Sequence, residues 1–377
     1  MQKREFLTIF EDARKLSNYK KKIVENIKSH NLPVVVFGAA EMAKVVTEEL
    51  KFFGVDVFGY AVDEEYYQPN QTYLGLPVFN FDVVSRESDK YVFVLGVGAK
   101  SGSEVRANKF MNDKNFLHYQ ILSGEGDFFG YNYILENQDK FFETYNMLSD
   151  ELSRQTMIAY LITHITDNPT DIANFVQSDE YFNEITRPAV CGGEGSFIDC
   201  GAYNGDTVKK FIDFVGGNYK KIFAVEPDPS NFEKLKKFVE ENDHKNVECF
   251  DCGVWNEQGV LYFSGSRGTT SRISENGSME LTLNTIDNIV GNEKITLIKM
   301  DIEGAELNAL KGAAQTLERF KPTLAISVYH KKDDLITIPQ FIKSIYKDCK
   351  FYIRKYDKVH SLWELDLYAV PNKGVLK

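Results

Sequence analysis

Long apolar runs, paired cysteines and an excess of basic residues are all missing from this chain. No window approaches the ~20 consecutive apolar residues that a transmembrane helix needs, and the first five residues lack the apolar core of a signal peptide. The five cysteines are an odd number without paired spacing, which argues against a secreted disulfide framework. These absences predict a soluble protein without a membrane span, in a reducing compartment and most simply the cytoplasm.

The charge balance excludes another class of function. Forty-four Lys and Arg stand against 55 Asp and Glu, so the net charge is −11. A field of this sign repels phosphates, so we expect no nucleic acid among the partners. Hydrophobic residues make up 43% and charged residues 26% of the 377 residues, values typical of globular chains and not of disordered ones. A chain of this length is expected to contain two or three domains.

The alternation of strand and helix patterns predicts an α/β protein with two Rossmann-like domains. Strands and helices alternate over residues 31 to about 122, and again from residue 195 onward, which is typical of parallel sheets covered by helices. The segment between them is rich in Phe and Tyr and reads as helices. We therefore predict an N-terminal Rossmann-like domain at 1–124, a helical linker at 125–190 and a second domain at 191–377.

The strongest local signal follows the predicted strand at 196–200. The strand ends near Asp199, a loop with Gly201 and Gly205 follows, and a helix begins near Asp206. Glycines allow a ligand to approach the backbone, and a helix start offers free N–H groups. The two carboxylates that flank the loop disfavour phosphate and favour a cation, such as an amino group or a sulfonium. The alternative is a tight strand-to-helix turn with a capping acid.

A second acidic residue ends the next predicted strand, at 221–225. Glu226 follows this strand and Pro227 ends it. An acid in this position of a Rossmann-like unit accepts hydrogen bonds from ribose hydroxyls. The alternative is that the segment only caps a helix, at Asp228 or Ser230. Because both acidic ends would meet at one crevice, the two signals together indicate a nucleoside site.

Three acids crowd the end of the predicted strand at 295–300. These are Asp301, Glu303 and Glu306, with Gly304 allowing a close turn into a helix predicted over 305–317. The acids could serve as general base, as ligands of a substrate hydroxyl or as metal ligands. The alternative is that Glu303 and Glu306 cap the helix. The charges alone do not rank the three.

These motifs carry a resemblance to a known family. The runs 197–207, 224–229 and 299–312, together with Lys321-Pro322, 327–330 and a terminal hairpin, resemble the FkbM-type S-adenosylmethionine-dependent methyltransferases. The resemblance covers roughly residues 177–371. It implies a class I methyltransferase fold, which is a seven-stranded and mostly parallel sheet with an antiparallel last strand. Cys200 and Tyr203 resemble a subgroup with an appended N-terminal domain.

The resemblance also implies a cofactor, S-adenosylmethionine, and its binding residues. In that family the first motif surrounds the methionine part, the acid after the second strand binds ribose, and the loop after the third strand borders adenine. The implied residues are Asp199, Gly201, Ala202, Tyr203, Asn204, Gly205, Asp206, Thr207, Glu226, Pro227, Asp228, Asp251, Cys252, Gly253 and Asp301. Family members are mostly O-methyltransferases, often acting on hydroxyls of sugars or natural products.

The first domain carries an incomplete nucleotide-binding pattern. Gly38 follows a buried strand, but Ala40 and Ala43 stand where the dinucleotide fingerprint has its further glycines. The domain is similar to the N-terminal domains of sugar-nucleotide acyltransferases. It could bind a nucleotide-sugar, or it could act as a scaffold or dimerise, and we favour the second because the phosphate-binding signal is incomplete.

We therefore predict methyl transfer from S-adenosylmethionine to a hydroxyl of a small molecule, sugar or glycan. An alcohol is a weak nucleophile at neutral pH, so a base or a metal must help to remove its proton. We predict Asp301, Glu303 and His330 as catalytic residues, because all three follow strand ends. No dedicated metal site is predicted. The alternatives are an oxidoreductase or epimerase that binds NAD or a nucleotide-sugar, and a non-catalytic scaffold with this fold.

Overall fold

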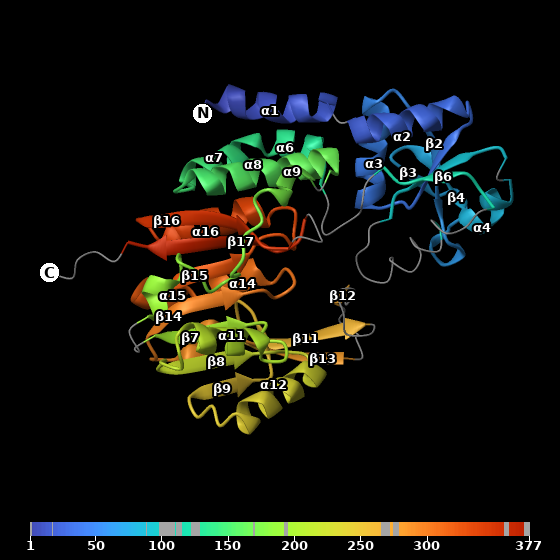
Figure 1. Cartoon of the computed structure of the whole chain (residues 1–377). Coiled ribbons are helices and arrows are strands. Elements are labelled where there is room, and N and C mark those ends of the chain that lie inside the picture. The colour runs from blue at the N-terminus through green and yellow to red at the C-terminus, as the bar shows by residue number, and fades with distance from the viewer. Residues whose placement is uncertain are drawn as a thin grey trace. The chain divides into compact units, whose positions relative to one another are not determined.

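The computed structural model shows two compact units in one chain (Figure 1). It describes residues 2–16, 18–87, 89–97, 110, 115–121, 129–168, 170–191, 195–264, 272–273, 279–357 and 362–372. Unit 1 comprises residues 1–142, 158–174 and 359–362, and unit 2 comprises 143–157, 175–358 and 363–377. The predicted boundary after residue 124 lies outside the described residues. Within the described ranges, no helix has the length and apolar character needed to cross a membrane.

Unit 1 is built on a six-stranded sheet in the order β3-β4-β2-β1-β5-β6. Its strands are β1 (Val34–Phe37), β2 (Val57–Val62), β3 (Thr72–Tyr73), β4 (Leu76–Asn80), β5 (Val92–Leu95) and β6 (His118–Tyr119). All pairings are parallel except that of β3 with β4. The helices of the unit are α1 (Lys3–Leu16), α2 (Asn18–Ser29), α3 (Glu41–Phe52), α4 (Phe81–Val84), α6 (Tyr131–Glu136) and α9 (Thr170–Ala173), with 3₁₀ turns η1 (Glu64–Tyr66) and η2 (Ser85–Glu87).

Close packing explains the glycine of the first-domain motif. Gly38 follows β1 with φ of 121°, and a Cβ atom there would lie 2.5 Å from the carbonyl oxygen of Gly96. The ends of β1 and β5 therefore approach too closely for any side chain. The predicted role of this domain as a scaffold or nucleotide-sugar binder stays a prediction.

Unit 2 is built on a seven-stranded sheet in the order β16-β17-β15-β14-β7-β8-β9, seen from top to bottom in Figure 1. The strands are β7 (Ser196–Cys200), β8 (Lys221–Val225), β9 (Val247–Phe250), β14 (Ile295–Met300), β15 (Thr323–Ser327), β16 (Cys349–Lys355) and β17 (Leu365–Pro371). Only β17 runs against its neighbours β15 and β16. The mostly parallel sheet predicted for this part of the chain, with its antiparallel last strand, is confirmed.

Helices and a small second sheet complete unit 2. The helices are α10 (Arg187–Val190), α11 (Asp206–Phe214), α12 (Pro229–Glu241), α13 (Ile286–Val290), α14 (Glu306–Lys311), α15 (Ala314–Phe320) and α16 (Asp334–Ile345). Helices α7 (Gln138–Met147) and α8 (Glu151–Thr166) contain residues of both units. The second sheet has the order β10-β13-β11-β12, formed by β10 (Gly253–Val254), β11 (Gly259–Ser264), β12 (Arg272–Ile273) and β13 (Met279–Asn284).

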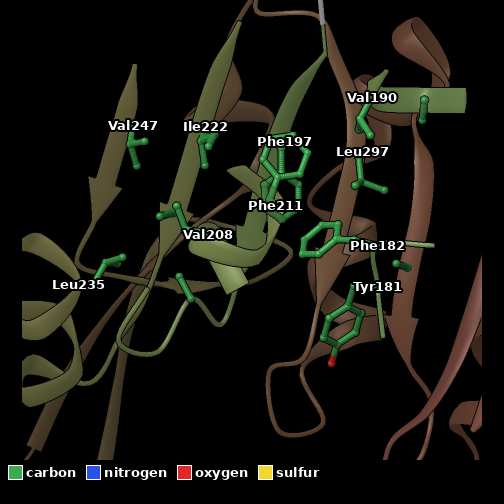
Figure 2. Close-up of a cluster of buried hydrophobic side chains, with 14 of the residues drawn as sticks. Tyr181, Phe182, Val190, Phe197, Val208, Phe211, Ile222, Leu235, Val247 and Leu297 are labelled. Atoms are coloured by element: carbon green, nitrogen blue, oxygen red, sulfur yellow. The ribbon is translucent and has the colours of Figure 1, made fainter. Parts of the chain in front are cut away.

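An aromatic cluster fixes α11 against the large sheet (Figure 2). The rings of Phe197 on β7 and Phe211 on α11 stack with centroids 4.5 Å apart. Phe182 meets both rings, at 5.6 Å and 5.5 Å. Full burial of one such side chain stabilises a fold by about 1.5–3 kcal/mol. The loop between β7 and α11 therefore has two firmly anchored ends.

The prediction of one helix over residues 305–317 is wrong, because the segment forms two helices, α14 and α15. A Cβ atom on Gly312 would lie 2.0 Å from the carbonyl oxygen of Trp255, so the chain at this point packs directly on another backbone segment. Asp287 then accepts hydrogen bonds from the N–H groups of Gln315 and Thr316 and starts a new helix. A tertiary contact thus overrides the local helical pattern.

Burial of His164 in unit 1 makes the stability of the fold depend on pH. The ring stacks on Phe129 with centroids 3.8 Å apart, and burial lowers the pKa of His164 to about 3. In the unfolded chain the pKa is about 6.5, so the unfolded state binds the extra proton as the pH falls below that value. The free energy of unfolding then falls by about 1.4 kcal/mol between pH 7.5 and 5.5 on account of this residue.

The variant His164→Phe retains a ring that can stack and removes the titration. As the pH falls from 7.5 to 5.5, the free energy of unfolding of the variant should decrease by about 1.4 kcal/mol less than that of the wild type. Urea denaturation followed by circular dichroism measures both. Equal pH dependence in the two proteins would contradict this account of His164.

Candidate active site

The loop that connects β7 with α11 is shaped by its two glycines. The N–H groups of Gly201 and Ala202 both donate to the carbonyl oxygen of Val225 at 3.0 Å, which ties the loop to the end of β8. Gly201 has φ of 84°, and a Cβ atom there would lie 2.1 Å from the carbonyl oxygen of Asp301. Gly205 has φ of 92° and lies against the ring of Phe238. Neither position accepts a side chain without a shift of its neighbours.

A buried ion pair lies beneath this loop. Lys299 on β14 stands opposite Asp199 on β7 in the strand register, and their Nζ and Oδ1 atoms are 3.0 Å apart. Both side chains are buried, and Lys299 also donates to the carbonyl oxygen of Gly201 at 2.8 Å. Burial opposes the charged form of Lys299, but the attraction of Asp199 and Asp301 raises its pKa above the usual value. Lys299 on β14 thus binds both the end of β7 and the glycine loop that follows it.

Glu226 lies at the end of β8 beside the same loop. Its two carboxylate oxygens accept hydrogen bonds from the N–H groups of Tyr203 and Asp228, both at 2.8 Å. The side chain is buried, and burial raises its pKa although these hydrogen bonds oppose the rise. Each carboxylate oxygen can accept more than one hydrogen bond. The carboxylate is thereby fixed in place and retains the capacity to accept hydrogen bonds from a ligand.

The other residues of the predicted cofactor set divide by their surroundings. Tyr203 is exposed with φ of 49°, whereas Ala202, Thr207 and Cys252 are buried. Asn204 accepts a hydrogen bond from the N–H of Asp206 at 3.2 Å. Asp228 caps α12 by accepting from the N–H groups of Ser230 and Asn231, as the alternative interpretation expected. Pro227 connects Glu226 with this cap. In the loop after β9, Asp251 is exposed and Gly253 begins β10.

The ends of β14 and β15 bring the three predicted catalytic residues together. His330 Nε2 lies 3.4 Å from Asp301 Oδ1 and 3.9 Å from Glu303 Oε2. On the other side of the ring, Nδ1 lies 2.8 Å from Glu306 Oε1. Burial alone would lower the pKa of His330, but Glu306, Asp301 and Glu303 raise it to about 9. Carboxylates therefore meet both nitrogens of one buried ring.

Asp301 connects this cluster with the glycine loop. Its N–H donates to the carbonyl oxygen of Cys200 at 3.2 Å, and its own carbonyl oxygen is the one that Gly201 approaches. Its side chain faces His330. The predicted cofactor loop and the predicted catalytic residues are therefore neighbours at one edge of the sheet.

Tyr181 contributes to the site although it is not among the predicted cofactor or catalytic residues. Its hydroxyl lies 3.2 Å from Asp301 Oδ2, where it donates, and 3.5 Å from Ser327 Oγ. Figure 2 shows it at the border of the aromatic cluster, with its hydroxyl pointing away from the other labelled side chains. Lys299 had no predicted role, and Glu306 was considered only as one of the three acids after the strand at 295–300. A lysine inside the buried run 295–300 was a usable signal, because a buried lysine needs a partner of opposite charge.

A cavity of about 840 Å³ in unit 2 lies outside the predicted set. Its lining includes Glu180, Phe182, Phe214, Tyr356 and Glu364. None of the residues predicted for the cofactor or for catalysis lines it. The candidate site therefore consists of the loop after β7, Glu226 and the His330 cluster, and this cavity is not part of it.

Comparisons with known proteins bear on the family and the fold of the chain. Residues 199–353 match the Methyltransferase FkbM domain family, so the family resemblance predicted from the motifs is confirmed for these residues. A crystal structure of the methyltransferase FkbM from Methylobacillus flagellatus KT aligns with 98% of this chain and 100% of that chain, at a TM-score of 0.62 and 21% identity. This likeness shows a shared fold, and the class I methyltransferase fold is confirmed.

Two further solved structures each cover about half of the chain. An rRNA methylase from Streptococcus thermophilus covers 50% of this chain and 92% of its own, at a TM-score of 0.34 and 14% identity. Aeropyrum pernix fibrillarin with bound S-adenosyl-L-methionine covers 48% of this chain and 68% of its own, at a TM-score of 0.31 and 14% identity. Scores this low support no conclusion about function. No curated protein matches the chain.

The close approach of Gly201 to Asp301 predicts a specific loss of stability. In Gly201→Ala the new methyl group would meet a backbone oxygen, whereas in Gly216→Ala it would meet no atom within 4 Å beyond the adjoining residues of the chain. Both positions have positive φ, so the backbone strain of about 1–2 kcal/mol is common to both variants. We expect the free energy of unfolding of Gly201→Ala to be lower by a further ~1–3 kcal/mol. Equal losses in urea denaturation would contradict the tight packing of this loop.

Proposed function

We propose, from the premise that residues 199–353 form a methyltransferase FkbM domain, that the protein transfers a methyl group from S-adenosylmethionine to a hydroxyl oxygen. The observation that carries the proposal is the buried carboxylate of Glu226, held by two backbone N–H groups beside the glycine loop after β7. A fixed carboxylate at this place in a class I fold is suited to accept hydrogen bonds from both ribose hydroxyls.

We assign the parts of the cofactor to the sheet edge as follows. The methionine part would lie along the loop of Gly201, Ala202, Asn204 and Gly205, where the backbone permits close approach. Lys299 balances the charge of the buried Asp199, so Asp206 supplies the negative charge near this loop that favours a ligand with an amino group and a sulfonium. The adenine would lie beyond Glu226, bordered by residues 251–253.

The chemical step is an in-line displacement. A lone pair of the acceptor oxygen forms the new O–C bond while the C–S bond breaks, and its electron pair stays on sulfur to give the neutral thioether. The hydroxyl proton leaves to a base. Most of the acceleration comes from alignment, with the reacting atoms about 3–3.5 Å apart before attack.

We assign the acceptor to the cluster of Asp301, Glu303 and His330. Asp301 adjoins the cofactor loop through its backbone, and its side chain faces His330, so an acceptor held here would lie beside the methyl donor. The side chains of Asp301 and Glu303 are 27% and 69% exposed, so an acceptor can reach them. Sugars, glycans and natural-product alcohols offer suitable hydroxyls, and the net charge of −11 speaks against a polynucleotide.

We also propose the cytoplasm as the location, supported by five cysteines that form no disulfide. We propose further that the N-terminal domain acts as a scaffold or mediates homo-oligomerisation.

Replacement of the ribose-binding carboxylate tests the cofactor assignment. We expect Glu226→Gln to bind S-adenosylmethionine about 10- to 100-fold more weakly in isothermal titration calorimetry, because the amide offers one acceptor oxygen fewer and turns a donor toward a backbone N–H. Glu241→Gln is the matched control, because Glu241 is 64% exposed on α12 and pairs only with Lys237 among the described ion pairs. Binding of NAD without binding of S-adenosylhomocysteine would favour the oxidoreductase alternative and overturn the proposal.

The acceptor assignment is tested by turnover. With a panel of glycans and alcohols screened by mass shift, we expect His330→Gln and Glu303→Gln to reduce methyl transfer to the responsive acceptor by about 100-fold or more, since proton removal contributes factors of this size. Their affinity for S-adenosylmethionine should stay close to that of the wild type. If the triple alanine variant of residues 301, 303 and 330 kept full turnover, the assignment would be wrong.

A further inference from the structure

We propose that the ends of β14 and β15 form a binding site for one divalent cation, with His330 Nε2 and the carboxylates of Asp301 and Glu303 as its protein ligands. The inference rests on the proposed function, because the cation would activate the acceptor hydroxyl at that same site. It departs from the sequence prediction, in which no dedicated metal site was expected.

The ligand atoms already lie at suitable separations. Nε2 of His330 is 3.4 Å from Asp301 Oδ1 and 3.9 Å from Glu303 Oε2. Ligands that surround one ion at about 2.0–2.2 Å stand roughly 3 Å from one another. His330 Nε2 therefore lies close enough to each of the two carboxylates to share an ion with it. Within the described part of the chain, one ligand atom from each of Asp301, Glu306 and His330 lies within 4.8 Å of the others, and Glu303 stands beside this group through its contact with His330.

Glu306 has the position of a supporting residue. Its Oε1 atom lies 2.8 Å from His330 Nδ1. The same oxygen accepts hydrogen bonds from the N–H groups of Ile302 and Gly304, at 2.9 Å and 3.3 Å. Three donors leave this oxygen little capacity for a metal ion. Metal-bound histidines commonly donate their second ring N–H to a carboxylate, which fixes the ring and its tautomer. Glu306 therefore orients Nε2 toward Asp301 and Glu303.

The charges and the exposure of the site also favour a cation. Asp301, Glu303 and Glu306 surround one imidazole, so carboxylates outnumber the positive charge even when the ring is protonated. His330 is buried at 6% exposure, while Glu303 stays 69% exposed, so the site is anchored at the ring and open at the carboxylates. One nitrogen and several oxygens form a donor set that suits Mn²⁺, Fe²⁺ or Zn²⁺, and it is less suited to Ca²⁺.

A cation here would change the chemistry of the acceptor. A hydroxyl bound to a divalent ion loses its proton more readily, because the metal stabilises the alkoxide. The proton passes to solvent or to a carboxylate, the oxygen lone pair attacks the methyl carbon, and the C–S electron pair remains on sulfur. No oxidant or reductant enters the step.

Mn²⁺ is the direct probe, because its free ion gives an electron paramagnetic resonance signal that is lost on binding. The full-length chain, treated with a chelator and dialysed, is titrated with MnCl₂ without cofactor or acceptor. We expect one Mn²⁺ bound per chain. Asp301→Asn and His330→Gln should each weaken binding by at least tenfold, and Glu241→Gln should bind as the wild type does.

Two measurements keep this test independent of folding and of the proposed function. Glu303→Gln alters an exposed side chain and should also weaken binding, so a loss seen there does not reflect unfolding. Affinity for S-adenosylmethionine is measured on the same metal-free samples. If that cofactor binds and no Mn²⁺ binds, or if Mn²⁺ binds equally to all three variants, the cation site is refuted and the methyltransferase proposal stands. If Mn²⁺ binds and the cofactor does not, the proposed function fails instead.

Discussion

The ion pair between Asp199 and Lys299 is the interaction on which the rest of the candidate site depends. The two residues stand opposite each other on adjacent parallel strands, and Lys299 also binds the carbonyl oxygen of Gly201. Removing one partner of a buried pair leaves an uncompensated charge, which commonly costs about 3–5 kcal/mol. The pair therefore stabilises the register between the ends of β7 and β14. It also fixes the course of the glycine loop above them.

From this pair the site extends in two directions along the sheet edge. Toward β8, the loop reaches the carboxylate of Glu226, which is held by the backbone of Tyr203 and Asp228. Toward β15, the backbone of Asp301 packs on Gly201 and its side chain faces His330. One half offers acceptors for a nucleoside, and the other gathers carboxylates around an imidazole. The donor of a methyl group and its acceptor would meet where Asp301 stands.

Much of this arrangement could be predicted from the sequence, because apolar runs that end in an acid mark the strand ends of a parallel sheet. The runs before Asp199, Glu226 and Asp301 predicted the strands β7, β8 and β14, and the structure places these three acids at one edge of the sheet. The contacts between distant segments could not be predicted, because strand order in space is not written in any local pattern. Lys299 lies next to Asp199 only because β14 pairs with β7. The split helix at Gly312 and the contact of Tyr181 with Asp301 likewise depend on packing partners elsewhere in the chain.

The central claim is that this sheet edge binds S-adenosylmethionine, and a crystal structure of the complex with S-adenosylhomocysteine tests it most directly. We predict density along the loop of residues 201–207, with both ribose hydroxyls within hydrogen-bonding distance of Glu226 and the sulfur facing the side of Asp301. Crystals grown at saturating ligand in which this edge is empty, or in which the nucleoside lies in the N-terminal unit near Gly38, would contradict the account.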